Sequence, residues 1–153
     1  MCWQCENPDK TQADYLELLR EKIASLGWVV QYVEGDRMPF AYTIGMHDRG
    51  LPELLVTGLA PKRAVWLLNT FTKRMLAGRP PVPGKQVCLP AGTRLELVEV
   101  AHPDAHLVMA VGIEGPDISA IQLVWADGRG RWPWAPNFND GHQPQAVLGN
   151  RAA

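Results

Sequence analysis

Apolar residues recur every three or four positions between Thr11 and Gly27, which places them on one face of a helix. Thr11 followed by Asp14 resembles a capping box, in which two side chains satisfy the first N–H groups of a helix. Gly27 is a common helix end, because glycine adopts left-handed backbone angles without strain. The pattern predicts an amphipathic helix packed on a sheet. Its apolar positions are Tyr15, Leu16, Leu19, Ile23 and Leu26.

A second helix is predicted between Pro61 and Gly78. Proline suits the first turn of a helix, because its φ is already helical and the N–H that it lacks would have no partner there. The apolar residues that this helix would bury are Ala64, Val65, Leu67, Leu68, Phe71 and Met75. The following residues 79–84 include three prolines and are predicted to form a loop or a rigid crossover.

Seven segments are rich in β-branched, aromatic and other apolar residues and are bounded by turn residues, which is typical of strands. They are residues 28–33, 40–46, 53–59, 86–89, 94–100, 106–113 and 120–125. The first two are predicted to form a hairpin. Successive strands with two separate helices indicate an α+β fold. We expect a mainly antiparallel sheet of about six to seven strands, with the two amphipathic helices packed beside it.

The chain is expected to form a single domain over residues 1–153. This length is common for one domain and allows roughly two thirds of the surface of the unfolded chain to be buried. No linker divides the chain. Residues 1–10 form an N-terminal segment with two cysteines, and residues 127–153 form an irregular tail that contains aromatic residues.

The distribution of charge narrows the classes of partner. Fifteen basic and sixteen acidic residues give a net charge of −1, and neither sign forms a block, so nucleic acid is not expected as a partner. No apolar run reaches the roughly 18 residues of a membrane span, and the N-terminus lacks the features of a signal peptide. We therefore expect a cytoplasmic protein, with no membrane partner, that binds a small molecule or another protein. The sequence leaves open whether it forms a homo-oligomer.

Several motifs resemble those of one bacterial family. They are Gly27-Trp28, the Pro-Phe-Ala-Tyr-Thr-Ile-Gly of residues 39–45, the Leu-Pro-Glu-Leu-Leu-Val-Thr-Gly-Leu of residues 51–59, Trp132-Pro133-Trp134 and Gln143-Pro144. Together they resemble the family named domain of unknown function 4262, over about residues 20–148. The Met-Cys-Trp-Gln-Cys start is similar to that of actinobacterial members. The resemblance implies a fold unit but no activity and no catalytic residues, so whether the protein is an enzyme stays open.

Cys2 and Cys5 have the spacing of a metal-binding or redox-active pair, because two intervening residues let both thiolates reach one metal ion or form a disulfide. An odd number of cysteines without a secretory signal favours thiols or metal ligands over a disulfide framework. We therefore predict that the protein binds zinc or iron through this pair. A small thiol oxidoreductase that uses the same cysteines is an alternative, although a thioredoxin-type motif would follow a strand and none precedes these residues.

A structural zinc site needs two further ligands. The candidates are His47, Cys88, His102, His106 and His142. His102 and His106 have the spacing of a histidine ligand pair, but they lie too far from Cys5 for a zinc finger, so only the tertiary fold could complete such a site. Otherwise they flank a surface turn. Cys88 lies in a short apolar segment and is predicted to be a small buried hydrophobic residue.

The C-terminal tail suggests a function without metal. Trp132, Trp134 and Phe138 alternate with prolines and, with Tyr42, are candidates for binding a peptide or a small molecule. The other interpretation is that these aromatic residues cover the open side of the sheet. Glu53, which follows Pro52, is predicted to be a structural carboxylate that accepts hydrogen bonds.

Overall fold

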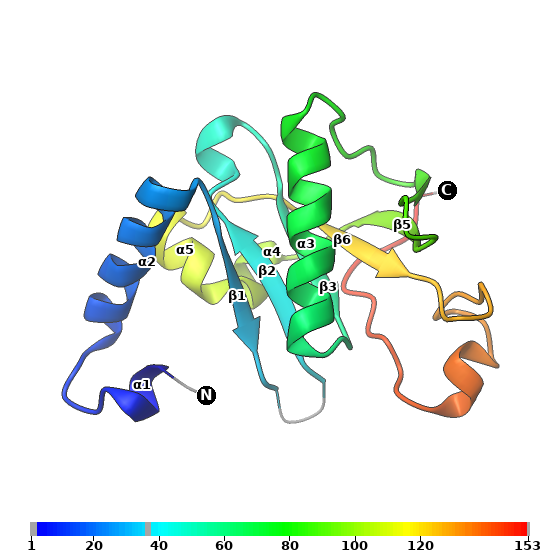
Figure 1. Cartoon of the computed structure of the whole chain (residues 1–153), viewed down its shortest axis with the longest axis horizontal. Helices are drawn as coiled ribbons and strands as arrows, with labels where there is room; N and C mark the ends of the chain where they lie inside the picture. Colours follow the sequence, from blue (N-terminus) through cyan, green and yellow to red (C-terminus); the bar gives the residue numbers. More distant parts are fainter. Residues whose placement is uncertain (1–2, 36–37, 153) are drawn as a thin grey trace.

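The structure, a computed structural model, describes residues 3–35 and 38–152 and contains one six-stranded sheet (Figure 1). The strands lie in the order β1-β2-β3-β6-β5-β4. Their bounds are β1 (Val29–Val33), β2 (Phe40–Ile44), β3 (Glu53–Thr57), β4 (Gln86–Cys88), β5 (Arg94–Glu99) and β6 (Ala120–Trp125). The central pair β3 and β6 is parallel, and the other four pairings are antiparallel. The predicted α+β fold with a mainly antiparallel sheet is confirmed, as is the first hairpin.

Helices cover both faces of this sheet. In Figure 1, α3 (Pro61–Leu76) lies in front of the sheet and α5 (Val108–Glu114) lies behind it, with α2 (Gln12–Leu26) at the side of the molecule. Two short helices, α1 (Trp3–Glu6) and α4 (Pro103–His106), precede α2 and α5, and two 3-10 turns are η1 (His47–Arg49) and η2 (Phe138–Gly141). Among the described residues, none of the helices is long and apolar enough to cross a membrane.

The two predicted helices are both present. The capping box of α2 is formed, because the Asp14 N–H donates to Thr11 Oγ1 (3.2 Å) and the Thr11 N–H donates to Asp14 Oδ2 (2.8 Å). Gly27 ends α2 with a φ of 96°, and its N–H donates to the carbonyl of Ile23. Pro61 is the first residue of α3. Local side-chain chemistry therefore determined where these helices begin and end.

The prediction of a strand over residues 106–113 is wrong. This segment contains the end of α4 and most of α5. Its apolar residues suggested a strand, but the two that are fully buried are Leu107 and Ala110, three positions apart, as on a helix face. Pro103 starts the preceding helical turn, and Gly115 ends α5. The burial of one helical face decided the conformation over the strand propensity of Val108 and Val111.

The core has two parts, one on each face of the sheet. β3 shows the division, because Leu54 and Val56 pack under α3 whereas Leu55 packs with α2 and α5. Successive side chains of a strand point to opposite faces, so a strand that is covered on both faces buries consecutive residues. This explains why all five residues of β3 are buried.

The C-terminal tail crosses the same face as α5 and is held by Gln122 of β6. The side-chain amide of Gln122 donates from Nε2 to the carbonyl of Ala146 (2.7 Å), and its Oε1 accepts from the N–H of Leu148 (2.8 Å). Gln145 forms two similar bonds with the backbone of Trp125. The fully buried Gln122 side chain therefore makes the hydrogen bonds to the tail backbone that a neighbouring strand would otherwise make.

We expect Gln122→Leu to lower the free energy of unfolding by about 2 kcal/mol, because it leaves the half-buried N–H of Leu148 without an acceptor and removes one of the two donors to the carbonyl of Ala146, the other being the Thr57 hydroxyl. The Leu148 amide should also lose hydrogen-exchange protection. Gln143→Leu is the matched control, since Gln143 is exposed. Urea unfolding and amide exchange measure the two effects, and unchanged protection of Leu148 would contradict this role of Gln122.

Candidate functional site

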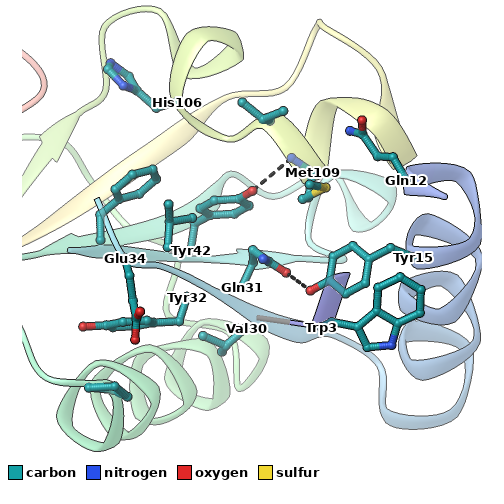
Figure 2. Close-up of a pocket in the computed structure, with 14 residues that line it drawn as sticks. Trp3, Gln12, Tyr15, Val30, Gln31, Tyr32, Glu34, Tyr42, His106 and Met109 are labelled. Carbon is teal, nitrogen blue, oxygen red and sulfur yellow. Dashed lines mark hydrogen bonds between the residues drawn. The ribbon is translucent and has the colours of Figure 1, made fainter. Parts of the chain in front are cut away.

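A cavity of about 730 Å³ lies along the outer edge of β1 (Figure 2). Five consecutive residues line it, from Val30 to Glu34. Because neighbouring side chains of a strand point to opposite faces, a cavity that touches all of them must open onto the edge of the strand. The other lining residues are Trp3, Gln12, Tyr15, Phe40, Tyr42, Pro61, His106, Val108 and Met109.

The backbone of β1 is available at this edge. β1 is the first strand of the sheet and pairs only with β2, so alternate N–H and C=O groups point away from β2. Among the described residues, none of these outward groups of residues 29–33 has a backbone hydrogen-bond partner. The edge therefore offers both donors and acceptors to a ligand in the cavity.

Aromatic rings form much of the cavity wall. Trp3 and Tyr15 bring α1 and α2 together, with 5.0 Å between their ring centroids. Phe40 and Tyr42 stack along β2 at 6.1 Å. Tyr32 lies at the other side of the opening (Figure 2) and donates from its hydroxyl to the carbonyl of Leu59 (2.9 Å). These rings provide flat apolar surfaces against which a planar group can stack.

Two polar side chains are fixed in orientation within this wall, as the dashed lines in Figure 2 show. The Tyr15 hydroxyl donates to Gln31 Oε1 (2.6 Å), which leaves Gln31 Nε2 to donate to a ligand. The Tyr42 hydroxyl accepts from the N–H of Met109 (2.9 Å). Burial raises the pKa of Tyr42 to about 12, against the opposing effect of the Met109 hydrogen bond. Tyr42 therefore stays neutral and keeps its proton as a donor.

The charges around the cavity favour neutral or cationic ligands. Glu34 contributes a carboxylate, and His106 is the one basic side chain among the described residues that line the cavity. No lysine or arginine is among those lining residues. An anion would meet the Glu34 carboxylate without a guanidinium or ammonium group to balance it.

Tyr42 is thus in this cavity, whereas the other predicted ligand-binding residues lie elsewhere. Trp132 and Trp134 stack on each other at 5.5 Å, with the Arg94 guanidinium over Trp132 and the Arg151 guanidinium over Trp134. Phe138 is buried against Trp125. The ring faces of Trp132 and Trp134 are therefore occupied by the protein's own side chains, although Trp134 is an exposed residue.

The Arg151 end of this stack is anchored to the sheet. Arg151 donates from Nε and Nη2 to the two carboxylate oxygens of Glu96 on β5 (2.7 and 3.0 Å). These hydrogen bonds lower the pKa of Glu96, with a further contribution from Gln86. The ion pair and the stacked tryptophans together fasten the C-terminal residues to β5.

The predicted metal ligands are not gathered by the described part of the fold. Cys2 lies outside the described residues, and Cys5 is exposed on α1. His106 lines the cavity, whereas the other three histidines are elsewhere: His47 in η1, His102 at the start of α4 and His142 after η2. Within residues 3–35 and 38–152, no group of three or more histidine, cysteine or acidic side chains could hold a metal ion. Metal binding or thiol chemistry at Cys2 and Cys5 stays a prediction.

The prediction that Cys88 is buried is wrong. Cys88 is exposed on β4, the other edge strand, where the buried residue is Val87. The alternation along a three-residue strand placed the thiol on the outer side. The neighbouring apolar residues did not indicate that Cys88 is exposed, because the pairing of β4 with β5 decides which face of β4 meets the core.

A second polar cluster joins α5 to the turn after β2. The fully buried Glu53 carboxylate accepts from the Thr43 hydroxyl (2.8 Å) and from the N–H groups of Gly45 (3.1 Å), Met46 (3.1 Å) and His47 (3.2 Å). The expectation that Glu53 is a structural carboxylate is therefore confirmed. Gly45 is required here, because its φ is 130° and a Cβ would lie 2.8 Å from the carbonyl oxygen of Gly27.

Glu114, at the end of α5, completes this cluster. Its Oε1 accepts from the Gly45 N–H (3.0 Å), and its buried Oε2 receives no donor from another described side chain or backbone group. Burial, a hydrogen bond to Glu53 and the negative charges of Glu53 and Asp48 raise the pKa of Glu114 to about 9. Glu114 therefore keeps its proton at neutral pH. Neither Glu53 nor Glu114 lines the cavity along β1.

Comparison with protein families identifies a match to the model described as "Domain of unknown function (DUF4262)" over residues 22–139. The chain belongs to this family. The matched segment contains all six strands, Gln31, Tyr42 and the Glu53–Glu114 pair. It begins after Trp3 and Tyr15, which form one wall of the cavity. No curated protein and no solved structure matched the chain significantly.

Four members of these clusters were not predicted from the sequence: Trp3, Tyr15, Gln31 and Glu114. A polar Gln31 among the apolar residues of β1 was the available signal for the cavity. Trp3 lies between the two cysteines that were predicted to bind metal, and its own position gave no separate signal, although it lines the cavity. Glu114 precedes a glycine and a proline, and such a position looks like an ordinary turn.

Proposed function

We propose that this protein is a binding module that takes a flat, neutral or cationic small molecule with an amide-like group into the cavity along β1. The observation that carries the proposal is that a free strand edge and five aromatic rings line the same cavity. The rings suit a planar group. The outward backbone groups of β1 and Gln31 Nε2 suit an amide or amidine, which both donates and accepts or donates twice.

The absence of lysine and arginine from the described lining residues supports a ligand that is neutral or cationic. A cation would gain from Glu34 and from the faces of the aromatic rings. A neutral amide would lose little free energy on leaving water, because hydrogen bonds to β1 replace its hydrogen bonds with water. A carboxylate would lose its hydration without gaining a cationic partner.

Three ligands of the same shape test this proposal: benzamide, benzamidinium and benzoate, which are neutral, cationic and anionic. We expect benzamide and benzamidinium to perturb the NMR signals of residues 30–34 and of the Gln31 side-chain amide, with dissociation constants of about 1 mM, as small fragments have. Benzoate should bind more weakly than either. Equal binding of all three, or perturbations confined to another face, would refute the proposal.

A pair of variants locates the site. Gln31→Leu should weaken benzamide binding about fivefold, which corresponds to one hydrogen bond of about 1 kcal/mol. Trp66→Ala is the matched control, since Trp66 is an exposed aromatic residue on α3 that does not line the cavity. The control should bind as the unmodified protein does.

A further inference from the structure

A second, polar cavity of about 340 Å³ lies between three segments that are distant in the sequence. Arg63 comes from the first turn of α3, residues 91–94 come from the turn between β4 and β5 and the first residue of β5, and residues 126–128 and 130 follow β6. Figure 1 shows the last two of these segments at the same side of the molecule. The lining contains two arginines, a threonine and three glycines.

The two arginines of this cavity carry charge that no carboxylate neutralises. None of the ion pairs among the described residues involves Arg63 or Arg94. Asp127, the one acidic group in the lining, is already fully engaged: its carboxylate accepts from the Arg131 side chain (2.8 Å) and from the N–H groups of Arg129, Arg131 and Asn139. Its donors therefore all come from residues 129–139, although the Arg131 guanidinium is shared with Asp140 (2.9 Å).

The pKa of Asp127 agrees with this arrangement. Burial acts to raise it, but the three backbone hydrogen bonds and the Arg131 side chain lower it to about 2. The carboxylate stays ionised and held by its donors, so it does not turn to pair with Arg63 or Arg94. The cavity keeps an excess of positive charge at neutral pH.

Arg94 is held in place before any ligand binds. Its guanidinium lies over the ring of Trp132, with 5.7 Å to the centroid. A Cβ at position 130 would lie 3.5 Å from Arg94 Nη1, an ordinary contact distance, so the guanidinium lies directly beside this loop. A guanidinium that is stacked on a ring keeps its N–H edge directed outward, which is the edge that binds a phosphate with two parallel hydrogen bonds.

The first turn of α3 adds to the positive electrostatic potential in this cavity. Its N-cap residue is Ala60, which provides no side-chain hydrogen bond, and no acidic residue occupies the first turn. The partial positive charge of a 16-residue helix is therefore uncompensated beside Arg63. Thr93 adds a hydroxyl donor to the lining.

From this geometry we propose that the cavity binds a phosphate group of a small molecule, with Arg63 and Arg94 as the two cationic contacts. The site is independent of the cavity along β1 and has the opposite preference for charge. Pro61 lines the first cavity and Arg63 lines the second, so the first turn of α3 separates them.

Titration with inorganic phosphate and with phenyl phosphate tests the site, with sodium chloride at equal ionic strength as the reference. We expect both phosphates to shift the NMR signals of residues 92–94 and 127–130 saturably, and phenyl phosphate to bind at least as tightly as phosphate. Tighter binding of inorganic phosphate would show that the site takes the free anion and would overturn a small-molecule ligand. The same shifts with chloride would overturn the site altogether.

Variants assign the contacts. Arg63→Gln and Arg94→Gln should each weaken phosphate binding about tenfold, whereas Arg79→Gln, at an exposed arginine outside the cavity, should leave it unchanged. Gly128→Glu should abolish binding, because a Cβ at this position meets no atom within 4 Å and the added carboxylate can pair with the arginines. Arg63 is an exposed helix residue, so its variant tests the proposal even if loss of the Arg94 stack disturbs folding. Binding by Arg63→Gln equal to that of the unmodified protein would refute the site.

Discussion

Glu53→Ala is expected to lower the free energy of unfolding by about 4 kcal/mol, because it removes the acceptor of one hydroxyl and three backbone N–H groups in a fully buried position. The loss of a single buried hydrogen bond costs about 1–3 kcal/mol when the partner stays without another acceptor. The Gly45 N–H keeps Glu114 Oε1 as an acceptor (3.0 Å), whereas the Thr43 hydroxyl and the Met46 N–H are buried and lose their acceptor. The cost should therefore be mainly that of two unsatisfied buried donors, reduced by local relaxation.

Urea unfolding of Glu53→Ala and of Glu99→Ala measures this effect. Glu99 is an exposed glutamate on β5 and serves as the matched control, with an expected change within about 0.5 kcal/mol. Glu53→Gln should fall between the two, since it keeps the size of the side chain and one acceptor oxygen. If Glu53→Ala unfolded at the same urea concentration as the control, the carboxylate would not be what holds the turn after β2.

The second large effect is a loss of stability as the pH rises, caused by Glu114. The folded chain keeps the Glu114 proton up to a pH of about 9, because burial and the adjacent Glu53 disfavour the charged form. The unfolded chain releases this proton near its ordinary pKa of 4.5. Between these values the folded state binds more protons, so the free energy of unfolding falls as the pH rises. Allowing for the partial exposure of Glu114, the contribution is about 3 kcal/mol over this window.

Glu114→Gln isolates this contribution. The glutamine amide can donate to Glu53 as the protonated acid does, but it does not titrate. The variant and the unmodified protein should be about equally stable near pH 5, and the variant should be more stable by about 3 kcal/mol near pH 9. The groups that act on Glu114 are Glu53, Asp48 and the N–H of Gly45, and all three are retained.

The measurement is urea unfolding of both proteins at pH 5, 7 and 9. Glu21→Gln, at an exposed glutamate of α2, is the control and should show no pH-dependent difference from the unmodified protein. A constant difference between Glu114→Gln and the unmodified protein across this range would mean that Glu114 is ionised in the folded state. A protonated Glu114 in the folded state at neutral pH would then be excluded.

The parts of the fold that could be predicted are those for which local chemistry and periodicity agree. The helix from Gln12 to Leu26 has its capping box, its apolar face and its terminal glycine within one continuous stretch. β6 has the bounds that its apolar run indicated, from Ala120 to Trp125. In these elements the residues that decide the conformation are neighbours in the chain, so the sequence pattern was sufficient.

The errors arose where distant contacts decided the structure. Val108 and Val111 favour a strand by propensity, but the burial of Leu107 and Ala110 under the sheet made α5. Cys88 became exposed because pairing with β5 turned Val87 to the core. Both outcomes depend on which face of an element meets the rest of the protein, and an isolated segment carries no information about this.

The amino-acid order was enough to predict the α+β fold, the positions of the two long helices, the family and the structural role of Glu53. Which side chains share a site depends on contacts between distant parts of the chain. Tyr15 meets Gln31 across 16 positions, and Glu114 meets Gly45 across 69. Hydrogen bonding, desolvation and the field of a neighbouring charge act over a few ångströms in space and are independent of separation along the chain. The cavity along β1, the raised pKa of Glu114 and the cavity that Arg63 and Arg94 line therefore exist only in the folded protein.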